Sequence, residues 1–258
     1  MLEPGRVFPL LTMLAVAAVT LHSIRSAIMG REIRIRDMPG VTAIEEMVGR
    51  ATEMGRPVHV STGVGTLTGG TAPEMFAGLQ VVSHVARLCA KYDSQLIATA
   101  CQPDVLVATI ETARQAYLEE GKGDRFKETD VRYLSTDQWA YAAGIVGIVA
   151  RENVSANILI GAFAAETMLL AEASFQAGAA QIAGTTNMYQ LPFFVAACDY
   201  TLIGEEVFAV SAFLSKDPIQ LGGLAGEDFG KALGIGLMIL GIIFASFKWT
   251  QLADLLKL

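Results

Sequence analysis

"PVHVSTGVGTLTGGTAPE", residues 57–74, is the stretch that decides the fold. A β-rich apolar run leads into a glycine-rich turn, and the turn ends in Thr71-Ala-Pro-Glu74, a hydroxyl-to-acid spacing typical of helix N-termini. The stretch predicts a strand at Val58–Thr62 and a helix from Thr71 to about Tyr92. Because phosphate-binding folds hold their ligand at such a turn, it also raises the question of a bound nucleotide.

Five further β-rich runs follow along the chain and alternate with helical patterns. We predict these strands at Gln95–Ala100, Val131–Leu134, Asn157–Ile160, Gln181–Ala183 and Thr201–Ile203. Strands that alternate with helices indicate crossover connections and therefore parallel strands. We expect an α/β domain at residues 31–216, with a Rossmann-like open parallel sheet and helices on both of its faces.

Both ends of the chain carry apolar runs. Hydrophobic residues make up 52% of the 258 residues and charged residues only 17%, which is too apolar for an ordinary soluble enzyme. Val7–Leu21 and Ala232–Phe247 contain no charge, and flanking residues can extend each toward the roughly 20 residues of a membrane span. We predict transmembrane helices in residues 1–30 and 231–258, with a linker at 217–230 before the second.

A secretory signal peptide is the alternative for the N-terminal run. No A-x-A cleavage site closes the run before Arg25, which favours a retained anchor. The small-xxx-small pairs Ala232/Gly236 and Gly241/Ala245 in the second run indicate contact with another helix.

The basic residues predict the orientation of the chain in the cell membrane. One arginine, Arg6, precedes the first run, whereas four follow it: Arg25, Arg31, Arg34 and Arg36. Because positive charge marks the cytoplasmic side, we expect the main domain in the cytoplasm and both termini outward. The net charge of −7 argues against a nucleic-acid partner.

The glycine-rich turn does not match either common nucleotide motif. Gly65 to Gly70 has the glycine spacing of a P-loop, but Thr71 and Ala72 stand where a lysine and a hydroxyl residue are required. The dinucleotide fingerprint also fails, because the third glycine is displaced and no acidic residue closes the next strand. A small anionic or polyhydroxyl ligand could still bind the amides at the helix start. The alternative is that the glycines only let the chain pass close to a neighbouring loop.

The carboxyl ends of the strands are where an open parallel sheet binds ligands. Glycines, hydroxyls and amides predicted at this edge form the candidate ligand-binding set: Ser61, Thr62, Gly63, Gly65, Gly69, Gly70, Thr71, Thr99, Thr185, Thr186 and Asn187. Many of these side chains would also be expected as helix caps. The edge has no histidine, lysine or arginine, so we predict neither a nucleoside triphosphate nor any other cofactor.

Catalytic candidates are few. Glu205 and Glu206 directly follow the sixth strand and could supply an acid and a base, although acidic residues in a first helical turn are the plainer account. Cys101 lies near a helix N-terminus, which could depress its pKa, but no base adjoins it in sequence. The cysteines show no metal-ligand spacing, so we predict no metal site and do not favour an enzyme.

Two predicted helices, at 139–150 and 162–179, are apolar nearly all round. Neither can leave a face in water without exposing a large apolar patch, so we predict a homo-oligomer that covers them. The expected interface residues are Gly144, Gly147, Glu166, Met168 and Phe175. The alternative is that both helices are buried within one chain.

Five segments, together with the N-terminal anchor, resemble a family of prokaryotic membrane-tethered proteins known only as a domain of unknown function. They read "RPVHVSTGVGTLTGGTAPEM", "LIATACQPDVL", "ILIGAFAAETMLLAE", "QIAGTTNMYQLPFF" and "DYTLIGEEVFA". The resemblance covers most of residues 31–230. It implies a membrane-associated role and assigns no role to any residue.

These observations lead to hypotheses from different functional classes. The favoured one is a membrane-anchored, self-associating protein that acts as a scaffold or structural subunit of a membrane assembly. A second is a Rossmann-like small-ligand-binding domain or enzyme that uses the glycine-rich loop 63–71. A third is an accessory subunit of a transporter or respiratory complex, whose partners would be other subunits of that complex.

Overall fold

The six strands predicted from the sequence are present and form one parallel sheet. They are β1 (Val58–Gly63), β2 (Leu96–Ala100), β3 (Val131–Tyr133), β4 (Ala156–Ala162), β5 (Ala180–Thr185) and β6 (Tyr200–Ile203). The order across the sheet is β3-β2-β1-β4-β5-β6, and every neighbouring pair is parallel. The predicted α/β class and Rossmann-like open sheet are therefore confirmed.

The structure is a computed structural model that describes residues 7–31 and 38–246. The chain forms two compact units. One unit runs from Arg36 to Ser215 and contains the sheet, and the other joins Met1–Ile35 to Lys216–Leu258.

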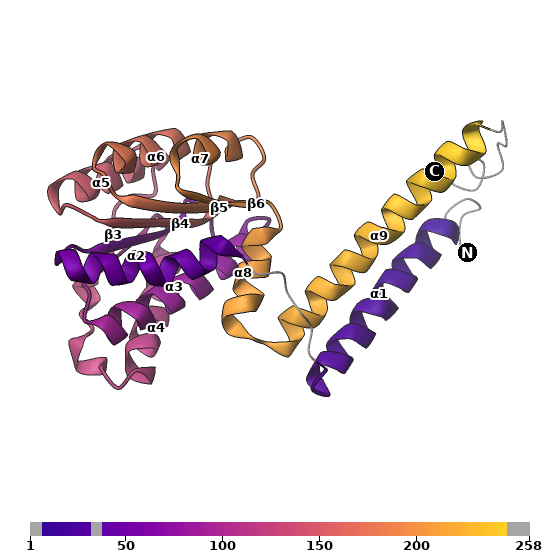
Figure 1. Ribbon diagram of the computed structural model, residues 1–258, viewed down its shortest axis with the longest axis horizontal. Helices are drawn as coiled ribbons and strands as arrows, with labels where there is room; N and C mark the ends of the chain where they lie inside the picture. The colour runs from indigo at the N-terminus through magenta and orange to yellow at the C-terminus, as the bar shows by residue number, and fades with distance from the viewer. Residues whose placement is uncertain (1–6, 32–37, 247–258) are drawn as a thin grey trace. The chain divides into compact units, whose positions relative to one another are not determined.

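Helices cover both faces of the sheet (Figure 1). One face is covered by α2 (Pro39–Met54), α3 (Ala72–Tyr92), α4 (Pro103–Glu119) and α8 (Glu206–Ser215). The other is covered by α5 (Gln138–Arg151), α6 (Thr167–Gln176) and α7 (Leu191–Ala197). Two short 3-10 turns, Gly123–Arg125 and Glu128–Asp130, connect α4 to β3. All residues of β1, β2, β4 and β5 are buried, which is why these strands appear as nearly continuous apolar runs in the sequence.

Helix α3 lies close to the centre of the sheet because of one glycine. A Cβ added at Gly78 would lie 2.5 Å from the carbonyl oxygen of Ile160 and 2.9 Å from Cγ2 of Thr62. Only a residue without a side chain allows the helix to approach β1 and β4 at this distance. This contact fixes where the N-terminus of α3 meets the glycine-rich loop.

The predicted helix at 162–179 is too long. Ala162 belongs to β4, and the helix of this region, α6, begins at Thr167 and ends at Gln176. The alanines that follow Gly161 favour a helix by propensity, but burial of β4 between β1 and β5 overrides that preference.

The stretch predicted as a linker, 217–230, is helical from Pro218 onward. It forms the first half of α9 (Pro218–Ser246), which packs against α1 (Val7–Ile28) within their unit. Gly222 and Gly226, two of the glycines that suggested a loop, instead lie in a helix–helix contact, where small side chains allow two backbones to approach closely.

The contact between α1 and α9 has a regular register. A Cβ added at Gly222 would lie 2.4 Å from Cα of Ile24, and a Cβ added at Gly226 would lie 2.2 Å from Oγ1 of Thr20. Gly226 follows Gly222 by four residues, whereas Thr20 precedes Ile24 by four residues. The two helices are therefore antiparallel. The predicted small-xxx-small residue Gly236 lies outside this contact, with nothing within 4 Å of an added Cβ.

One helix within the described residues is long and apolar enough to cross a membrane, and it is Pro9–Ile28 of α1. A retained anchor and a signal sequence both satisfy this criterion. No second candidate is found at the C-terminal side of the described residues, where α9 carries Glu227, Asp228 and Lys231. The end of the predicted second run, from residue 247 onward, lies outside the described residues.

Replacing Gly78 by alanine is expected to destabilise the sheet unit. The new methyl group would overlap the Ile160 carbonyl, which costs roughly 1–3 kcal/mol and outweighs the gain in helix propensity of up to about 1 kcal/mol. Gly49→Ala in α2 is the matched control, because nothing lies within 4 Å of its added Cβ. The urea midpoint of the full chain in mild detergent should fall for Gly78→Ala and stay level or rise for Gly49→Ala. Equal shifts in the two variants would contradict the close contact.

Candidate functional site

The strand order creates one switch point in the sheet. The chain leaves β1 toward β2 on one side, whereas β4 is followed by β5 on the other, so β1 and β4 are neighbours whose connections diverge. Ligands of open α/β sheets bind outside the carboxyl ends of the strands at such a point. The glycine-rich loop 63–71 and the loop 163–166 both begin there.

The first glycines of the loop let it pack directly on the end of β4. Gly63 has a φ of +88°, and an added Cβ would lie 2.1 Å from the carbonyl oxygen of Ala162. An added Cβ at Gly65 would lie 2.7 Å from both Cβ of Ala162 and Sδ of Met75. Gly63 and Gly65 therefore allow close packing where a phosphate-binding loop would leave space for its ligand.

Several N–H groups of the loop are already used as donors within the domain. The Val64 N–H donates to the Ala162 carbonyl at 2.9 Å, and the Gly63 N–H donates to Oγ of Ser61 at 3.1 Å. The Leu67 N–H donates to Oδ2 of Asp104 at 3.2 Å. This carboxylate brings negative charge against the loop, so the arrangement opposes the anionic ligand that bare amides would favour.

Thr71 begins α3 as its N-cap residue but does not cap the helix with its side chain. Its hydroxyl oxygen accepts from the Thr66 N–H at 3.2 Å. The spacing from Thr71 to Glu74 predicts that the Thr71 side chain caps the helix, and this prediction is wrong. The Thr71 hydroxyl instead forms its hydrogen bond within the loop. Gly69 and Gly70 are exposed, and nothing lies within 4 Å of a Cβ added at either. This exposed end is the open part of the loop.

The loop after β5 is tied to its neighbours by three predicted ligand residues. Thr186 donates to the carboxylate of Glu74 on α3, and Nδ2 of Asn187 donates to the Phe163 carbonyl at 3.1 Å. Oγ1 of Thr185 accepts from the Asn187 N–H at 3.3 Å. The structure thus brings Thr185, Thr186 and Asn187 to the carboxyl edge, where their hydrogen bonds join one loop to the next.

Glu166 is fully buried at the N-terminus of α6 and is paired inside the domain. Its Oε2 accepts from Nε2 of Gln138 at 2.6 Å, and its Oε1 accepts from the Ala164 N–H at 3.0 Å. The expected interface residue Glu166 is thus buried and paired inside its own domain. The carboxylate instead joins the start of α5 to the start of α6.

The other predicted interface residues divide into two groups. A Cβ added at Gly144 would meet the side chain of Leu134 at 2.9 Å, and one at Gly147 would meet the Arg151 guanidinium at 2.7 Å. These two glycines lie against side chains of their own domain. Met168 and Phe175 face solvent and are 55% and 70% exposed.

Sequence reasoning missed a chain of buried polar side chains on the α5–α6 face of the sheet. Nδ1 of His59 is 2.6 Å from Oδ1 of Asn157, and Nε2 of His59 is 3.0 Å from Oγ1 of Thr99. The Tyr141 hydroxyl is 3.2 Å from Oγ1 of Thr99 and 2.7 Å from Oγ of Ser61. Thr99 and Ser61, predicted as ligand residues, are therefore part of the core. Thr62 is also buried, on the α3 side of β1.

The donors and acceptors in this row of buried polar side chains can be assigned from Asn157 onward. Nδ2 of Asn157 donates to Oγ of Ser174 at 2.6 Å, so its Oδ1 accepts from Nδ1 of His59. Nε2 of His59 then carries no proton and accepts from Thr99. Burial lowers the pKa of His59 to about 4, so the ring is neutral at physiological pH. Fully buried and satisfied on both nitrogens, His59 has a structural role.

The sequence does contain a signal for this row of buried polar side chains. His59 and Ser61 are two residues apart in β1, and Thr99 and Asn157 interrupt the apolar runs of the two strands beside it. Polar residues at alternate positions of neighbouring buried strands share one face of the sheet, where they must pair with one another.

The catalytic candidates lie in separate settings. Burial, followed by the charges of Glu166 and Asp137, raises the pKa of Cys101 to about 11, which is opposite to the expected depression and keeps the thiol protonated. Glu206 lies in the first turn of α8 and accepts from the Ile203 N–H at 3.0 Å, and Glu205 is exposed in the turn before it. Within the described residues, no group of three or more His, Cys, Asp or Glu side chains is placed to hold a metal ion.

A family model described as a domain of unknown function (DUF6754) matches residues 1–256. The chain belongs to the DUF6754 family. The resemblance to an uncharacterised family is thereby confirmed, while the match says nothing of membrane tethering. No curated protein and no solved structure matches the chain.

The buried His59 predicts that this DUF6754 chain loses stability in mild acid. Unfolded histidine binds a proton below pH 6.5, whereas folded His59 does so only near pH 4. The contribution of His59 to the free energy of unfolding is therefore constant above about pH 6.5 and falls below it, by at most about 1.4 kcal/mol per pH unit. Burial also lowers the pKa of His84, which adds a loss of the same sign.

Urea unfolding of the full chain at pH 7 and pH 5 measures this loss. The His59→Gln variant should show a smaller difference between the two pH values than the wild type, and His84→Gln should retain most of it. If His59→Gln kept the whole difference, the neutral buried ring would not be its source.

Proposed function

We propose that this DUF6754 protein is a membrane-anchored scaffold, or structural subunit of a membrane assembly, whose α/β domain self-associates. The observation that carries the proposal is an apolar surface on α6, α7 and the segment between β5 and α7. This α6–α7 surface consists of outward-facing side chains that are at least two-fifths exposed: Met168, Leu169, Phe175, Met188, Tyr189, Phe193 and Val195.

The composition of the α6–α7 surface favours burial against another protein. Phe175 is 70% exposed and Tyr189 is 87% exposed, and both are aromatic residues of the kind enriched in subunit interfaces. Apolar groups of this number on one side of a domain are costly in water, and a second copy of the chain would remove them from it. Self-association needs no partner beyond the chain itself.

The hydrogen bonds at the carboxyl edge also favour a structural role over catalysis or ligand binding. Its carboxylates accept from protein donors: Asp104 from Leu67, Glu74 from Thr186 and Glu166 from Gln138. Groups that bind one another across loops give a rigid edge and are not free to act as acid, base or ligand-binding group without breaking those bonds. A structural role agrees better with this edge than catalysis does.

Membrane attachment is the second part of the proposal. We infer that α1 anchors the protein in the membrane through Pro9–Ile28. In the register set by Gly222 with Ile24 and Gly226 with Thr20, the charged residues Glu227, Asp228 and Lys231 of α9 lie opposite the middle of this span, so α1 alone supplies the anchor of this proposal. Arg25 and Arg31, which follow the apolar run of α1, favour the cytoplasmic side for the domain and the outer side for the N-terminus.

Self-association is tested with a matched pair of double variants. Phe175→Ser with Leu169→Ser alters the α6–α7 surface, and Phe76→Ser with Val107→Ser alters exposed apolar residues on α3 and α4. In mild detergent, light scattering and native mass spectrometry should show an oligomer for the wild type and the control pair. The α6–α7 pair should weaken assembly by at least about tenfold, since buried aromatic anchors contribute more than 1 kcal/mol.

A wild-type monomer would overturn the scaffold proposal. A monomer that retained a small molecule in native mass spectrometry would also reverse the ranking in favour of a ligand-binding domain that uses loop 63–71. An oligomer unaffected by the Phe175 and Leu169 substitutions would show that another surface assembles the chain.

The anchor and its orientation are tested by cysteine labelling in cells, in a Cys198→Ser background because the other two cysteines are buried. A cysteine at Glu53, exposed on α2, should react with a membrane-impermeant maleimide only after the cells are permeabilised. A cysteine at Glu3 should react in intact cells. Labelling of Glu53→Cys in intact cells would reverse the orientation, and release of the protein by alkaline extraction would exclude the membrane anchor.

A further inference from the structure

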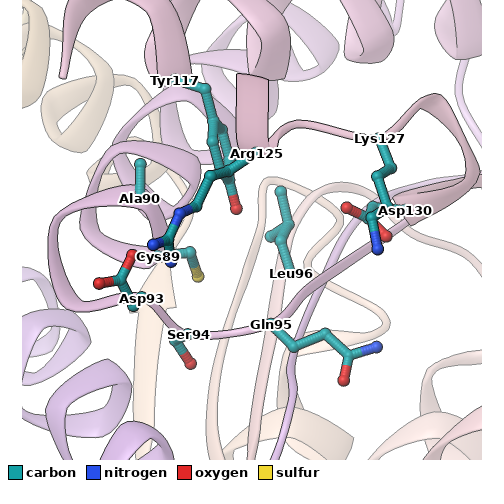
Figure 2. A pocket seen from close by; sticks show the side chains of 10 residues that line it. All are labelled: Cys89, Ala90, Asp93, Ser94, Gln95, Leu96, Tyr117, Arg125, Lys127 and Asp130. Carbon is teal, nitrogen blue, oxygen red and sulfur yellow. Dashed lines mark hydrogen bonds and ion pairs between the residues drawn. The ribbon is translucent and has the colours of Figure 1, made fainter. Parts of the chain in front are cut away.

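A recess lies at the edge of the sheet opposite the switch point. It is a pocket of about 350 Å³ at the amino end of β2, between the C-terminal ends of α3 and α4 and the two 3-10 turns that follow α4 (Figure 2). The side chains that matter for its chemistry are Ser94, Gln95, Leu96, Arg125, Lys127 and Asp130. None of them belongs to the carboxyl edge.

Ser94 contributes to this pocket a hydroxyl group that lacks a hydrogen-bond partner among the described residues. The residue is only 9% exposed, and its Oγ is buried without a hydrogen-bond partner among the described residues. The turn that ends α3 holds it in place, because Asp93 adopts a left-handed conformation with a φ of 58° and the Ser94 N–H donates to the Cys89 carbonyl at 2.9 Å. A buried hydroxyl without a partner costs roughly 1–3 kcal/mol, and rotation of the Ser94 side chain into the pocket would let a polar ligand group satisfy it.

The charges around the pocket are of both signs. Asp93 is already paired, since Oδ1 accepts from Nζ of Lys122 at 2.8 Å and from the Arg125 guanidinium at 2.7 Å. Figure 2 shows Arg125 reaching toward Asp93 on one side of the pocket and Lys127 with Asp130 on the other. Burial raises the pKa of Asp130, while the nearby charges of Lys127 and Arg132 oppose that rise. A cation and an anion therefore stand next to each other in a partly desolvated position.

This pattern selects among ligand classes. A polyanion such as a nucleotide would be repelled by Asp93 and Asp130, and a simple cation would be repelled by Arg125 and Lys127. A ligand with one positive and one negative group joined through a single carbon atom matches the Lys127–Asp130 pair. The ring of Tyr117 and the side chain of Leu96 add an apolar wall for the rest of a small molecule.

We propose that this pocket binds a small zwitterion of the α-amino-acid class. The ligand carboxylate binds Lys127, and the ligand ammonium donates to Asp130 and, once the Ser94 side chain turns into the pocket, to its Oγ. Gln95 offers a further amide at the pocket entrance. The site is independent of self-association, so the scaffold proposal can fail without affecting it.

The test measures binding of two α-amino acids, L-valine and L-glutamine, to the full chain in mild detergent by calorimetry and thermal shift. Isobutylamine and isovalerate are the matched probes, because each keeps the valine side chain with one of its two charged groups. We expect saturable binding of at least one amino acid, and binding of each single-charge probe at least about tenfold weaker, since a hydrogen bond to a charged group contributes roughly 1.5–3 kcal/mol.

Three variants locate the binding in the pocket. Lys127→Met and Asp130→Asn should each weaken binding by at least about tenfold. Ser94→Ala should weaken it while leaving the melting temperature of the unliganded protein unchanged or higher, because an unpartnered hydroxyl is removed. Lys91→Met and Glu53→Gln remove the same kinds of charge outside the pocket and should leave the affinity unchanged.

Several results would overturn the proposal. They are no saturable binding of either amino acid, isovalerate or isobutylamine binding as tightly as valine, and affinity that is unchanged in both Lys127→Met and Asp130→Asn. Loss of affinity in the Lys91 and Glu53 controls would likewise reject the pocket as the site.

Discussion

The close approach of β1 and β4 is the constraint on which the rest of the sheet unit depends. Gly63 and Gly161 have positive φ values, and a Cβ added at either would lie within 2.2 Å of a carbonyl oxygen of the other strand. Gly78 extends the same contact to α3. Backbone therefore meets backbone at the centre of the sheet, where other α/β folds leave a crevice for a ligand.

This packing has consequences on both sides of the contact. On the α5–α6 face, the polar chain from Ser61 through Tyr141, Thr99 and His59 to Asn157 links three adjacent strands by directed hydrogen bonds. A fully satisfied buried network specifies one arrangement of the strands, since any shift in register would leave several polar groups unpaired.

The two edges of the sheet consequently differ in chemical character. At the carboxyl edge, acidic and amide side chains are engaged with neighbouring loops, as Glu166 is with Gln138. At the amino end of β2, a pocket retains a buried hydroxyl without a partner and charges of both signs. Side chains at the carboxyl edge are thus bonded to neighbouring loops, whereas the pocket at the opposite edge holds a buried hydroxyl without a partner among the described residues, and the α6–α7 surface exposes apolar side chains.

The sequence by itself determined the strands, the parallel α/β architecture and the absence of a P-loop. Strands buried on both faces are apolar runs bounded by turns, and the missing lysine after Gly70 is a local fact of composition. Only the tertiary structure decided what the polar and glycine residues do. His59 and Asn157 are 98 residues apart and Gln138 and Glu166 are 28 apart, so no local spacing reveals that they pair. Likewise, Gly222 and Gly226 indicate a loop until α1 provides the helix against which they pack, because a glycine's role depends on what lies beside it.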